Sequence, residues 1–588
     1  METIDTDVLV VGAGPAGLTA AALLAREGVD ALTVTKYPGT AHSPRAHITN
    51  QRTMEVFRDL GMEDAVRAVA TPNELMGANV WATSFAAPEL ARLATWGTAE
   101  DRLSDYAAAS PSRMCNIPQH VLEPVILERA LELGADIRFS SELVTVTQDD
   151  ERVEAVIRHR HTGEETRIRA RYAIGADGGR STVAEQLGFA FDGESGLGAA
   201  ANVWLEADLT RYTAHRPGTL YWMCRPGNDY WVGSGTWICV KPWTEWVLLF
   251  MYDPAEEPDL SEDAVRERAR VTIGDDAVDV SIKAVSTWQI NHVVAREYRR
   301  GRVFLAGDAA HRHPPANGLG TNTSIQDSYN LCWKLAAVLR GEAGEELLDS
   351  YDAERQPVGR QVVDRAMQSV RDMAPLSAAF GFRPDQTAEE GWAALEELSS
   401  ASEEGRRRRA ELAAAVELQN HQFNCHGVEL DQRYESGAVL DDGSAWPEPD
   451  RDPELYHRPT THPGARVPHA RLQAGDRPLS TLDLCGGGRY ALLTGIGGEA
   501  WCAAAESVAE ELGVPVRAAV IGAGREYLDV YGDWARRREV DDDGCVLVRP
   551  DGHVAWRSPG PTDDPVASLR HALTTTLARA GRPVPVGG

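Results

Sequence analysis

Hydrophobic and polar residues follow a repeated order along the chain, and that order predicts the main elements. Residues 8–11 form a short apolar run, the segment GAGPAG follows, and an Ala- and Leu-rich run continues to Gly28. A short apolar run, a glycine turn and a longer run of helical spacing predict a strand, a tight turn and a helix. RYAIGADGGRSTVAEQLGF repeats this layout, and GRVFLAGDAA begins a third copy. We therefore expect an α/β fold.

The segment HRHPPANGLGTNTSIQDSYNLCWKL, residues 311–335, joins the third apolar run to a further helix. Gly318 and Gly320 lose much conformational freedom on folding, which indicates that a ligand needs this backbone exposed. Residues 323–326, Thr-Ser-Ile-Gln, fit a capping box. Apolar residues then recur at helical spacing, at Ile325, Tyr329, Cys332, Ala336 and Leu339. The pattern predicts a packed helix that begins near Ser324.

Two later regions have different patterns. Residues 200–290 contain the aromatic runs GTLYWMCRPG, DYWVGSGTWICV and WVLLFMYD, whose alternation predicts an antiparallel sheet. The polar, Pro-rich passage of residues 446–469 is typical of a connector. From Leu472 onward, the apolar runs predict a β, α, β order followed by a β-hairpin.

Composition limits the class of protein. The chain has 588 residues with 43% hydrophobic and 25% charged residues, which is typical of a globular protein of three to four domains. No apolar run is long enough to span a membrane, and METIDTDVLV lacks the basic start of a signal peptide, so we expect a cytoplasmic protein. A net charge of −29 argues against nucleic acid or an anionic membrane as partner. The eight cysteines form no CxxC pair, and we expect no metal site.

The GAGPAG turn, residues 12–17, has the form of a dinucleotide-binding motif. Gly12 permits the tight turn, Gly14 lets the backbone approach a pyrophosphate, and Gly17 allows close helix-to-strand packing. The second strand, ALTVTKYPG, ends on Thr35 and Lys36, where an acidic residue that binds the adenosine ribose is expected. This motif alone therefore does not decide between FAD and NADP.

Taken in this order and spacing, GAGPAG, DGGRS and GDAAH resemble the FAD-dependent aromatic hydroxylases, the single-component flavoprotein monooxygenases. Residues 44–56, residues 286–335 and the segment VLVRPDGHVAWR are similar to the phenol hydroxylase branch, and most similar to its dichlorophenol hydroxylase type. The likeness covers essentially the whole chain. It implies a Rossmann-like FAD-binding domain interleaved with a substrate domain built on an antiparallel sheet, and a C-terminal thioredoxin-like domain without CxxC.

The resemblance also implies domain boundaries. Residues 1–200 and 286–375 would form the discontinuous FAD-binding domain, with residues 75–115 contributing to the substrate domain. Residues 201–285 would form the substrate-binding sheet, and residues 376–465 a helical and connector segment. Residues 466–588 would be the thioredoxin-like domain, with a role in packing or dimerisation, and we expect a homodimer or higher homo-oligomer.

In such enzymes the glycine turn cradles the FAD pyrophosphate, Arg45 and Gln119 lie against the cofactor, Asp177 serves both FAD and the nicotinamide donor, and Asp308 bonds the ribityl chain. The loop amides before the helix would face the flavin N1 and C2 carbonyl and stabilise the negative charge of reduced flavin. The full set of expected FAD-binding residues is Gly12, Gly14, Pro15, Ala16, Gly17, Thr35, Lys36, Arg45, Gln119, Asp177, Gly307, Asp308, Pro315, Gly318, Gly320, Thr321 and Asn322.

The reaction that the resemblance implies uses NADPH or NADH and O2, and it hydroxylates a small phenolic substrate through a flavin C4a-hydroperoxide. His47 stands where phenol hydroxylase carries an active-site Asp, so it is either the base that deprotonates the phenol or a structural histidine. Trp222, Trp237 and Trp288 are candidates to stack on the substrate, although each also suits an ordinary core.

Some residues and alternatives stay open. Asn317 replaces a glycine that many relatives carry, and His311 and His313 are read as turn residues that hydrogen-bond locally. A flavin epoxidase or a Baeyer–Villiger oxygenase acting on a polyketide can share every FAD motif, and a noncatalytic flavin-binding module is a further alternative. A flavin halogenase is disfavoured because the chain has no WxWxIP segment.

Overall fold

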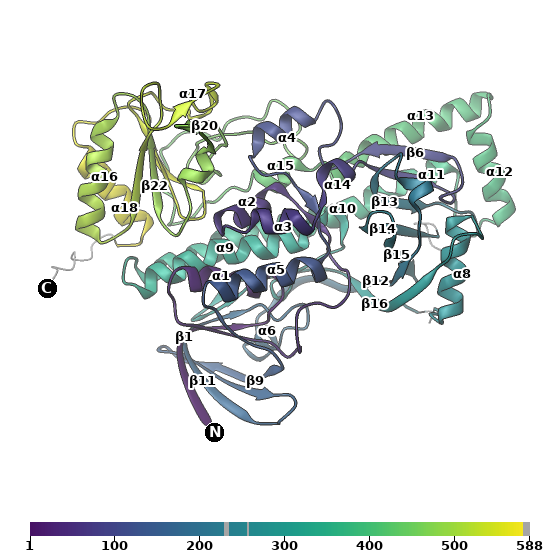
Figure 1. The fold of residues 1–588 in the computed structure, drawn as a ribbon, viewed down its shortest axis with the longest axis horizontal. Helices are drawn as coiled ribbons and strands as arrows, with labels where there is room; N and C mark the ends of the chain where they lie inside the picture. The colour runs from purple at the N-terminus through teal and green to yellow at the C-terminus, as the bar shows by residue number, and fades with distance from the viewer. Residues whose placement is uncertain (228–233, 256–257, 580–588) are drawn as a thin grey trace.

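The computed structural model describes residues 1–227, 234–255 and 258–579 as a mixed α/β protein with three β-rich parts (Figure 1). The sheet that contains β1 lies at the bottom of Figure 1, a second large sheet lies at its right, and the C-terminal part lies at its upper left. Helix α9 (Gly320–Leu339) runs between them. The α/β class predicted from the sequence is confirmed.

The first sheet has eight strands and a mostly parallel centre. Its main path is β17-β18-β11-β1-β2-β8, and β10 pairs with β11 and with β9. The bounds are β1 (Glu2–Val11), β2 (Ala31–Val34), β8 (Asp136–Arg138), β9 (Ser141–Gln148), β10 (Val153–His159), β11 (Glu165–Gly175), β17 (Arg299–Arg300) and β18 (Val303–Leu305). The pairs β1–β2, β1–β11, β2–β8 and β11–β18 are parallel.

The parallel strands are buried on both faces, which explains their continuous apolar sequences. Val8, Leu9 and Val10 have no exposed surface, and the strand β18 residues are equally buried. Helices α1 (Pro15–Arg26), α5 (Gln119–Glu132) and α9 pack together over this sheet, since α1 contacts both of the others. Burial of these runs is the main apolar stabilisation of this part.

The second sheet has the strand order β19-β16-β12-β15-β14-β13-β5-β6. The bounds are β5 (Ala78–Ala82), β6 (Glu89–Ala94), β12 (Phe191–Glu206), β13 (Gly218–Met223), β14 (Gly235–Lys241), β15 (Glu245–Tyr252), β16 (Ser281–Ala295) and β19 (His311–Arg312). Neighbouring strands are antiparallel, as the alternation predicts, except that β13 pairs with β5 in parallel. Of the predicted run DYWVGSGTWICV, residues 229–233 lie outside the described residues.

The two faces of the second sheet have different coverings. Tyr221, Trp237 and Leu248 lie on one face, in a core shared with helix α8 (Glu262–Ile273), which we call the α8 face. Strand pairing places Thr236 opposite Trp222 and Leu249, so these side chains lie on the other face. We call this other face the site face, because it is the face that Ile48 contacts in the adjoining core.

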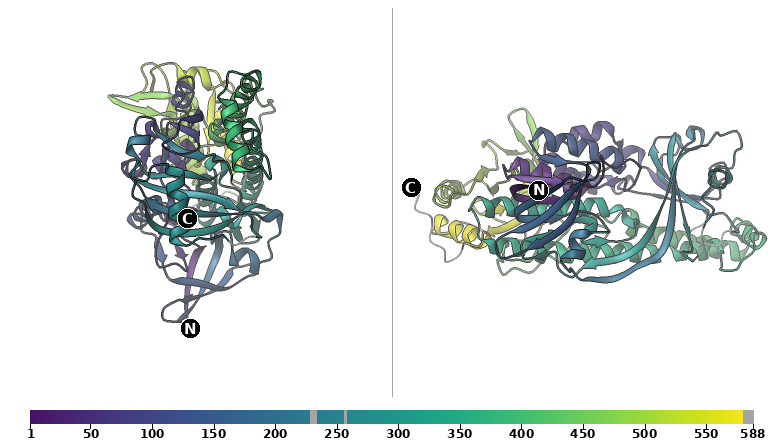
Figure 2. Two further views of the ribbon diagram at one scale, coloured as in Figure 1. Left: turned by 90° about the vertical axis from the view of Figure 1, so that its right-hand side faces the viewer. Right: turned by 90° about the horizontal axis from the view of Figure 1, so that it is seen from below.

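Helices extend along the long axis of the molecule, as Figure 2 shows. Helix α10 lies beside β16 and α9. Helices α11 to α14 cover the outer end of the site face, whereas α15 lies against α2. Their bounds are α10 (Asp349–Asp372), α11 (Ala374–Phe380), α12 (Ala388–Leu398), α13 (Glu403–Leu418), α14 (Asn420–Phe423) and α15 (His426–Leu430).

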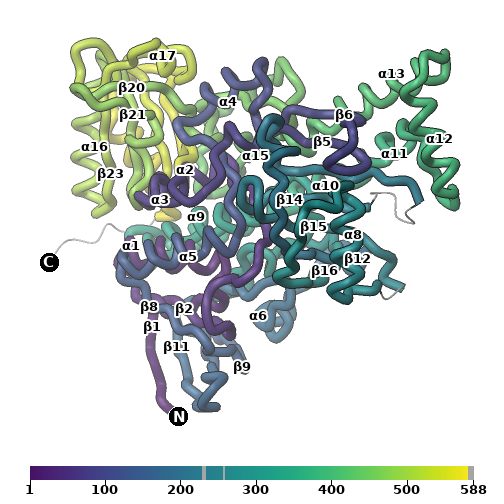
Figure 3. Tube along the Cα trace, turned by 45° about the vertical axis from the view of Figure 1, so that its right-hand side comes forward, coloured from purple at the N-terminus to yellow at the C-terminus, as the bar shows by residue number. Residues whose placement is uncertain are grey.

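The C-terminal part has a four-stranded sheet of order β23-β22-β25-β26, with helices α16 and α18 packed against each other. Here β22 (Tyr490–Thr494) and β23 (Val516–Val520) are parallel, whereas β25 (Cys545–Val548) and β26 (Val554–Ser558) form a hairpin. The helices are α16 (Glu499–Leu512) and α18 (Pro565–Thr576). Helices α2 (Gln51–Asp59) and α3 (Glu63–Val69) lie beside this part and α9 (Figure 3), and α9 also packs directly on this part through Trp333 and Ala337. The predicted β, α, β, hairpin order is confirmed.

Within residues 1–227, 234–255 and 258–579, no helix combines the length and apolar character that crossing a membrane requires. In the same residues, no three or more His, Cys, Asp or Glu side chains are grouped to hold a metal ion.

Candidate functional site

The three sequence motifs meet at one edge of the first sheet. Val11 pairs with Gly175, and Gly175 pairs with Leu305, so β1, β11 and β18 end side by side. The GAGPAG, DGGRS and GDAAH segments each follow one of these ends. The carboxyl edge of adjacent parallel strands is the usual ligand site of an open α/β sheet.

The glycine turn has the geometry that the sequence predicts. A Cβ on Gly12 would stand 2.1 Å from the Ala176 carbonyl oxygen, and one on Gly17 would stand 1.9 Å from the Gly12 oxygen, so both positions require glycine. A Cβ on Gly14 would meet nothing closer than 3.9 Å, so Gly14 borders open space instead. No side chain caps the α1 end, where Pro15 and Ala16 begin the helix. Its free amides therefore form a site for an anion such as a pyrophosphate.

The Gly307–Asp308 turn is held from behind by Asp327. The Asp327 carboxylate accepts hydrogen bonds from the Gly307 amide (3.0 Å), from His311 Nε2 (2.9 Å) and from Arg355 Nε (2.8 Å). Asp327, His311 and Arg355 have fully buried side chains. The structure thus places His311 as a positioning residue behind the turn.

Asp308 itself faces outward from this support. Its side chain is solvent-exposed, and no group in the described part of the chain donates a hydrogen bond to its carboxylate. Surrounding protein nevertheless raises the pKa of this carboxyl by desolvation, which the charges of His311, Arg312 and Arg45 oppose. This exposed carboxylate is available to accept hydrogen bonds from a bound polyol chain.

Asp177 has mainly a local role. Its carboxylate accepts from Ser181 Oγ (2.5 Å) and from the Val183 amide (3.2 Å) at the start of α6 (Thr182–Gln186). Arg312 joins the second and third motifs, because its Nη1 donates to the Gly179 carbonyl at 2.6 Å. The structure brings Asp177 to the site edge, with both carboxylate oxygens already partnered.

Arg45 and Gln119 also reach this edge. The Gln119 amide nitrogen lies 3.5 Å from the Arg45 carbonyl, and the Gln119 side chain donates to Glu123 Oε1 at 2.6 Å. Glu123 Oε1 is also the atom nearest to the open space at Gly14. Desolvation raises the pKa of Glu123, and Arg45 is among the groups that oppose this shift. Glu123 is a site residue that the sequence analysis missed, although its spacing of four from Gln119 was a usable signal.

The loop of residues 315–322 and the start of α9 differ from the prediction. The helix begins at Gly320, with Leu319 as its N-cap and no side-chain cap, so the predicted capping box at residues 323–326 is wrong. Ser324 Oγ instead bonds to the Gly320 carbonyl one turn earlier, inside the helix (2.8 Å). The first-turn amides, which include those of Thr321 and Asn322, thus have no side-chain acceptor, which suits a negatively charged group.

Asn322 fixes this loop to the strand that follows His47. Its Oδ1 accepts from the Asn50 amide (3.0 Å), and its Nδ2 donates to the Ile48 carbonyl (2.9 Å) and the Gly318 carbonyl (2.6 Å). Gly318 has a φ of +65°, and a Cβ there would lie 2.8 Å from Ile48. The Asn322 side chain is therefore structural, and Pro315 is the exposed residue of the loop.

Asn317 and His313 support the loop from within. Asn317 is buried at a φ of +67° and donates to the His421 carbonyl at 2.7 Å. His313 bonds through Nδ1 to the Pro314 carbonyl at 2.6 Å, as a turn residue would, and burial lowers its pKa to about 4. Its buried Nε2 has no partner in the described residues and lies 3.4 Å from where a Gly320 Cβ would be.

His47 directly precedes strand β3, next to the same loop, and a chain of hydrogen bonds fixes its tautomer. Asn116 Nδ2 donates to the Cys239 carbonyl (2.9 Å), so Asn116 Oδ1 is the acceptor for His47 Nδ1 (2.9 Å). The proton therefore resides on Nδ1, and Nε2 carries a free lone pair. Burial lowers the pKa of His47 to about 4, against the smaller effect of Asn116, so the ring is neutral near pH 7. The strands β3 (Ile48–Thr49) and β7 (Cys115–Asn116) pair here.

Thr35 and Lys36 follow β2 at the same sheet. The Thr35 backbone bonds to the Arg138 carbonyl and to the Ser141 amide (3.0 and 2.7 Å), and its side chain is nearly buried. The Lys36 ammonium lies 5.7 Å from the Tyr37 ring centroid. Both residues lie directly after the end of β2, so the position where an acidic ribose-binding residue is expected is occupied by Thr35 and Lys36.

The three candidate tryptophans do not lie together. Trp222 and the half-buried Trp288 are on the site face, where Trp288 Nε1 donates to Asn202 Oδ1 at 3.2 Å. Trp237 is fully buried on the α8 face, where its Nε1 donates to Thr272 Oγ1 at 3.0 Å. Trp237 is thus a core residue. Side chains alternate between the two faces of a strand, and Trp237 directly follows Thr236, which lies on the site face.

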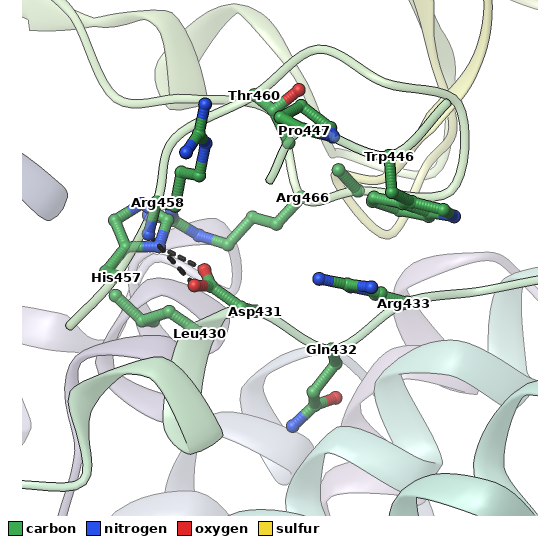
Figure 4. A pocket seen from close by; sticks show the side chains of 11 residues that line it. Leu430, Asp431, Gln432, Arg433, Trp446, Pro447, His457, Arg458, Thr460 and Arg466 are labelled. Carbon is green, nitrogen blue, oxygen red and sulfur yellow. Dashed lines mark hydrogen bonds and ion pairs between the residues drawn. The ribbon is translucent and has the colours of Figure 1, made fainter. Parts of the chain in front are cut away.

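A small pocket lies elsewhere, between the connector and α15 (Figure 4). Its volume is about 40 Å³, and its Asp431 carboxylate is already bonded to His457 Nδ1 and to the Arg458 amide. None of the residues predicted for the cofactor or substrate lines it. It has room for one or two water-sized molecules and is separate from the motif edge.

The residues at the motif edge fit FAD. The open space at Gly14, the uncapped α1 and α9 ends and the partnerless Asp308 carboxylate are suited to a pyrophosphate, a flavin and a polyol. The sequence did not predict the residues that position these groups, which are Asn116, Glu123, Arg312, Asp327 and Arg355. Four of them contact partners far away in the sequence, whereas Glu123 bonds to Gln119, four residues away.

Comparison with known proteins agrees with this site. Residues 5–366 match the family model described as FAD binding domain, and residues 460–580 match that described as aromatic-ring hydroxylase, C-terminal. The chain is 47% identical over 577 residues to 2,4-dichlorophenol 6-monooxygenase of Delftia acidovorans, covering 98% of each chain. It is 45% identical to phenol 2-monooxygenase of Pseudomonas sp. strain EST1001, covering 97% of this chain and 93% of that one.

Among solved structures, the flavin-dependent monooxygenase PieE in complex with FAD and substrate matches with a TM-score of 0.95. That match is 49% identical and covers 98% of this chain and 100% of PieE. The resemblance seen in the motifs is confirmed, and with it the use of FAD, NAD(P)H and O2. The chain belongs to the FAD-dependent aromatic-ring hydroxylases and is a flavoprotein monooxygenase.

Proposed function

We propose that the aromatic substrate is a phenol, and that His47 binds its hydroxyl group. The observation that carries this proposal is the fixed tautomer of His47. Asn116 and the Cys239 carbonyl hold the proton on Nδ1, so Nε2 presents a lone pair to a hydroxyl donor. The names of the relatives support a phenolic substrate, since they include 2,4-dichlorophenol and phenol monooxygenases.

FAD would be held at the motif edge. Gly12, Gly14 and Gly17 with the α1 amides would bind its pyrophosphate, Asp308 its ribityl hydroxyls, and the α9 amides its pyrimidine edge. Arg45 and Gln119 would lie along it, while Asp177 would keep the adjoining turn in shape. Bound FAD would carry electrons from NAD(P)H to O2 and activate O2, so that one of its oxygen atoms reaches the aromatic ring.

The low pKa of His47 decides what this residue can do. Near pH 7 its ring is neutral and therefore able to accept a proton. Full transfer from a phenol is costly in the free site, because burial disfavours the imidazolium. A bound phenolate next to the His47 imidazolium would offset that cost by its opposite charge. His47 thus orients the phenol and takes the proton of its hydroxyl group. Loss of that proton makes the aromatic ring of the substrate a stronger nucleophile.

The site face of the second sheet would cover the substrate. Asn202, Trp204, Ile238, Leu249 and Trp288 are on this face and only half-buried. On the reverse face, Val203, Leu205, Trp237 and Leu248 have no exposed surface. A sheet that is sealed on one side and half-open on the other leaves room for a flat apolar ligand.

His47→Ala is the test of this assignment. We expect hydroxylation of 2,4-dichlorophenol to fall by 10²-fold or more, in the range of a lost acid–base group, with flavin reduction by NAD(P)H changed less than threefold. His215→Ala, at an exposed residue, is the control. Equal losses in both half-reactions would show that His47 is structural, and unchanged hydroxylation would exclude it from the chemistry.

A flavin epoxidase or Baeyer–Villiger oxygenase of a polyketide is distinguished by its products. The proposal requires that simple phenols yield dihydroxylated products 16 mass units heavier, with one O2 consumed per product. NAD(P)H oxidation that produces only hydrogen peroxide with every phenol would contradict a phenolic substrate.

We further propose that residues 466–588 are a thioredoxin-like domain with a packing role, and that the other boundaries lie as the resemblance implies. The parallel β22–β23 pair, the β25–β26 hairpin and the two flanking helices support this proposal. Burial raises the pKa of the Cys485 thiol to about 12, and the pKa of Cys502 is also raised, so neither is an activated thiolate. A homodimer or higher homo-oligomer and a cytoplasmic location stay predictions.

A further inference from the structure

A wholly buried amide lies on the site face without any hydrogen-bond partner. Asn79 of β5 has no exposed surface, and neither its Nδ2 nor its Oδ1 bonds to a group in the described part of the chain. Leaving such groups unpaired destabilises the protein. Buried side-chain amides in native proteins almost always have partners, so Asn79 indicates a ligand or an ordered water.

Two more partnerless polar atoms lie on the same face. Asn79 pairs in register with Leu220 of β13, and Trp222 follows two residues later on the same side. Trp222 stands directly opposite Thr236 of β14. Trp222 Nε1 and Thr236 Oγ1 are both buried, and neither has a partner in the described residues. One amide, one indole N–H and one hydroxyl thus share a face within three adjacent strands.

The same strands link this group to His47. Asn116, the partner of His47, donates to the Cys239 carbonyl of β14. Ile238, which directly precedes Cys239, pairs with Leu220, and Leu220 pairs with Asn79 on β5. Asn79 on β5 is therefore two strand spacings, about 10 Å, from β14, the strand to which Asn116 donates. That separation exceeds the length of a single phenol ring.

The surroundings of these atoms determine which chemistry suits them. The adjoining core consists of apolar and aromatic side chains, including Trp81, Trp96, Leu376 and Phe423. A carboxylate buried among them without a cation would be very costly. A neutral group is compatible, since Asn79 both donates and accepts, Trp222 donates, and Thr236 does either.

We propose that Asn79 and Trp222 form a subsite for a neutral, oxygen-bearing substituent of the aromatic substrate, with Thr236 next to Trp222 on the His47 side and Asn79 remote from the hydroxyl that His47 binds. A carboxamide or a ketone has the required acceptor. The substrate is then larger than one ring, either a bicyclic phenol or a phenol with a polar side chain. This inference rests on the proposed function, because it uses His47 as the anchor for the phenolic end.

The test uses two probes that differ only in the remote group, 2-naphthol and 6-hydroxy-2-naphthamide. Binding to the FAD-loaded enzyme is followed by the change in flavin absorbance, so it is measured without turnover. We expect wild type to bind the amide at least tenfold more tightly than 2-naphthol. Asn79→Leu removes that preference and leaves 2-naphthol binding within threefold, because Leu has the same number and branching of side-chain heavy atoms as Asn but no hydrogen-bonding groups.

Protein stability separates the subsite from a structural role. Since the Asn79 amide has no partner in the free enzyme, Asn79→Leu is expected to keep or raise Tm without probe. Thr236→Val is a second variant that should reduce the amide preference, and Thr244→Val, at an exposed position, is its control. A lowered Tm with equal weakening of both probes would overturn the proposal, as would wild type that binds both probes equally. Failure of hydroxylation with a retained amide preference would instead contradict the proposed function alone.

Discussion

Charged groups at the contact between α10 and the C-terminal part all have protein partners, whereas polar groups at the motif edge lack them. At this contact Glu354, which is fully buried, accepts hydrogen bonds from Arg549 (2.5 and 2.9 Å), Lys334 (2.7 Å), Asn330 (2.7 Å) and Ser436 (2.6 Å). At the motif edge, the Asp308 carboxylate has no donor in the described residues. His47 Nε2 and His313 Nε2 are likewise without protein partners there.

The difference shows which polar groups serve the fold and which serve a ligand. A buried charge network persists only when every member is satisfied, and the Glu354 network meets that condition with contacts from three parts of the chain. Buried polar groups without partners, such as His313 Nε2, are destabilising unless something else completes them, whereas the exposed Asp308 carboxylate is open to a ligand. At the motif edge, FAD and a phenol are the groups that would do so.

Breaking the Glu354 network is expected to have the largest effect on stability. Glu354→Ala leaves Arg549 and Lys334 buried without their common partner, so the free energy of unfolding should fall by about 3–5 kcal/mol. Chemical denaturation of the FAD-loaded enzyme measures this change, with Glu435→Ala at an exposed residue as control. A loss below 1 kcal/mol would mean that these charges are not the structural network described above.

Filling the phosphate cradle should instead affect the ligand and not the fold. In Gly14→Ala the new Cβ has no protein neighbour closer than 3.9 Å, so the apoprotein should unfold at the wild-type temperature. FAD would meet the methyl group, and its Kd should rise at least tenfold, or about 1.4 kcal/mol. Flavin fluorescence titration gives the Kd, and Gly437→Ala, another glycine with free space, is the control. Unchanged FAD affinity would place the pyrophosphate elsewhere.

Glu429 provides a smaller test of the cost of a poorly paired buried group, because its Oε1 accepts only from Cys425 Sγ (4.0 Å) and its Oε2 has no partner in the described residues. Desolvation raises its pKa to about 8, against the charge of Arg102. The folded state then keeps a proton between about pH 4.5 and 8 that the unfolded state releases, so stability falls as pH rises through this window. Glu429→Gln should reduce that fall by at least ~1 kcal/mol between pH 5 and 8, measured by chemical denaturation. An identical pH slope in the variant would show that Glu429 has an unrecognised partner.

Local patterns predicted the parts of the site that depend on neighbours in the sequence. The glycine turn was correct because Gly12 and Gly17 are required by contacts within one strand–turn–helix unit and its neighbouring strand. The capping box failed because Asn322 bonds to Ile48 and Asn50, far away in sequence, and these bonds accompany a helix that starts at Gly320. A tertiary contact overrode a valid local signal.

Local sequence patterns also could not predict the hydrogen-bond partners of His47 or the face of the sheet on which Trp237 lies. Asn116 is 69 residues from His47, and the pairing of β3 with β7 brings them together. Trp222 and Trp237 looked equivalent in the sequence, but strand register puts Tyr221, not Trp222, opposite Trp237. A single position of register therefore decides which tryptophan can reach a substrate.

The most direct test of the account compares Asp308→Ala with wild type in two states, as apoprotein and with FAD. Because the Asp308 carboxylate is solvent-exposed and has no hydrogen-bond donor in the described residues, the apoprotein Tm should stay unchanged. The Kd for FAD should increase at least tenfold, since the ribityl hydroxyls lose their acceptor. An apoprotein Tm that falls as steeply as in Glu354→Ala, together with an unchanged FAD Kd, would contradict the account.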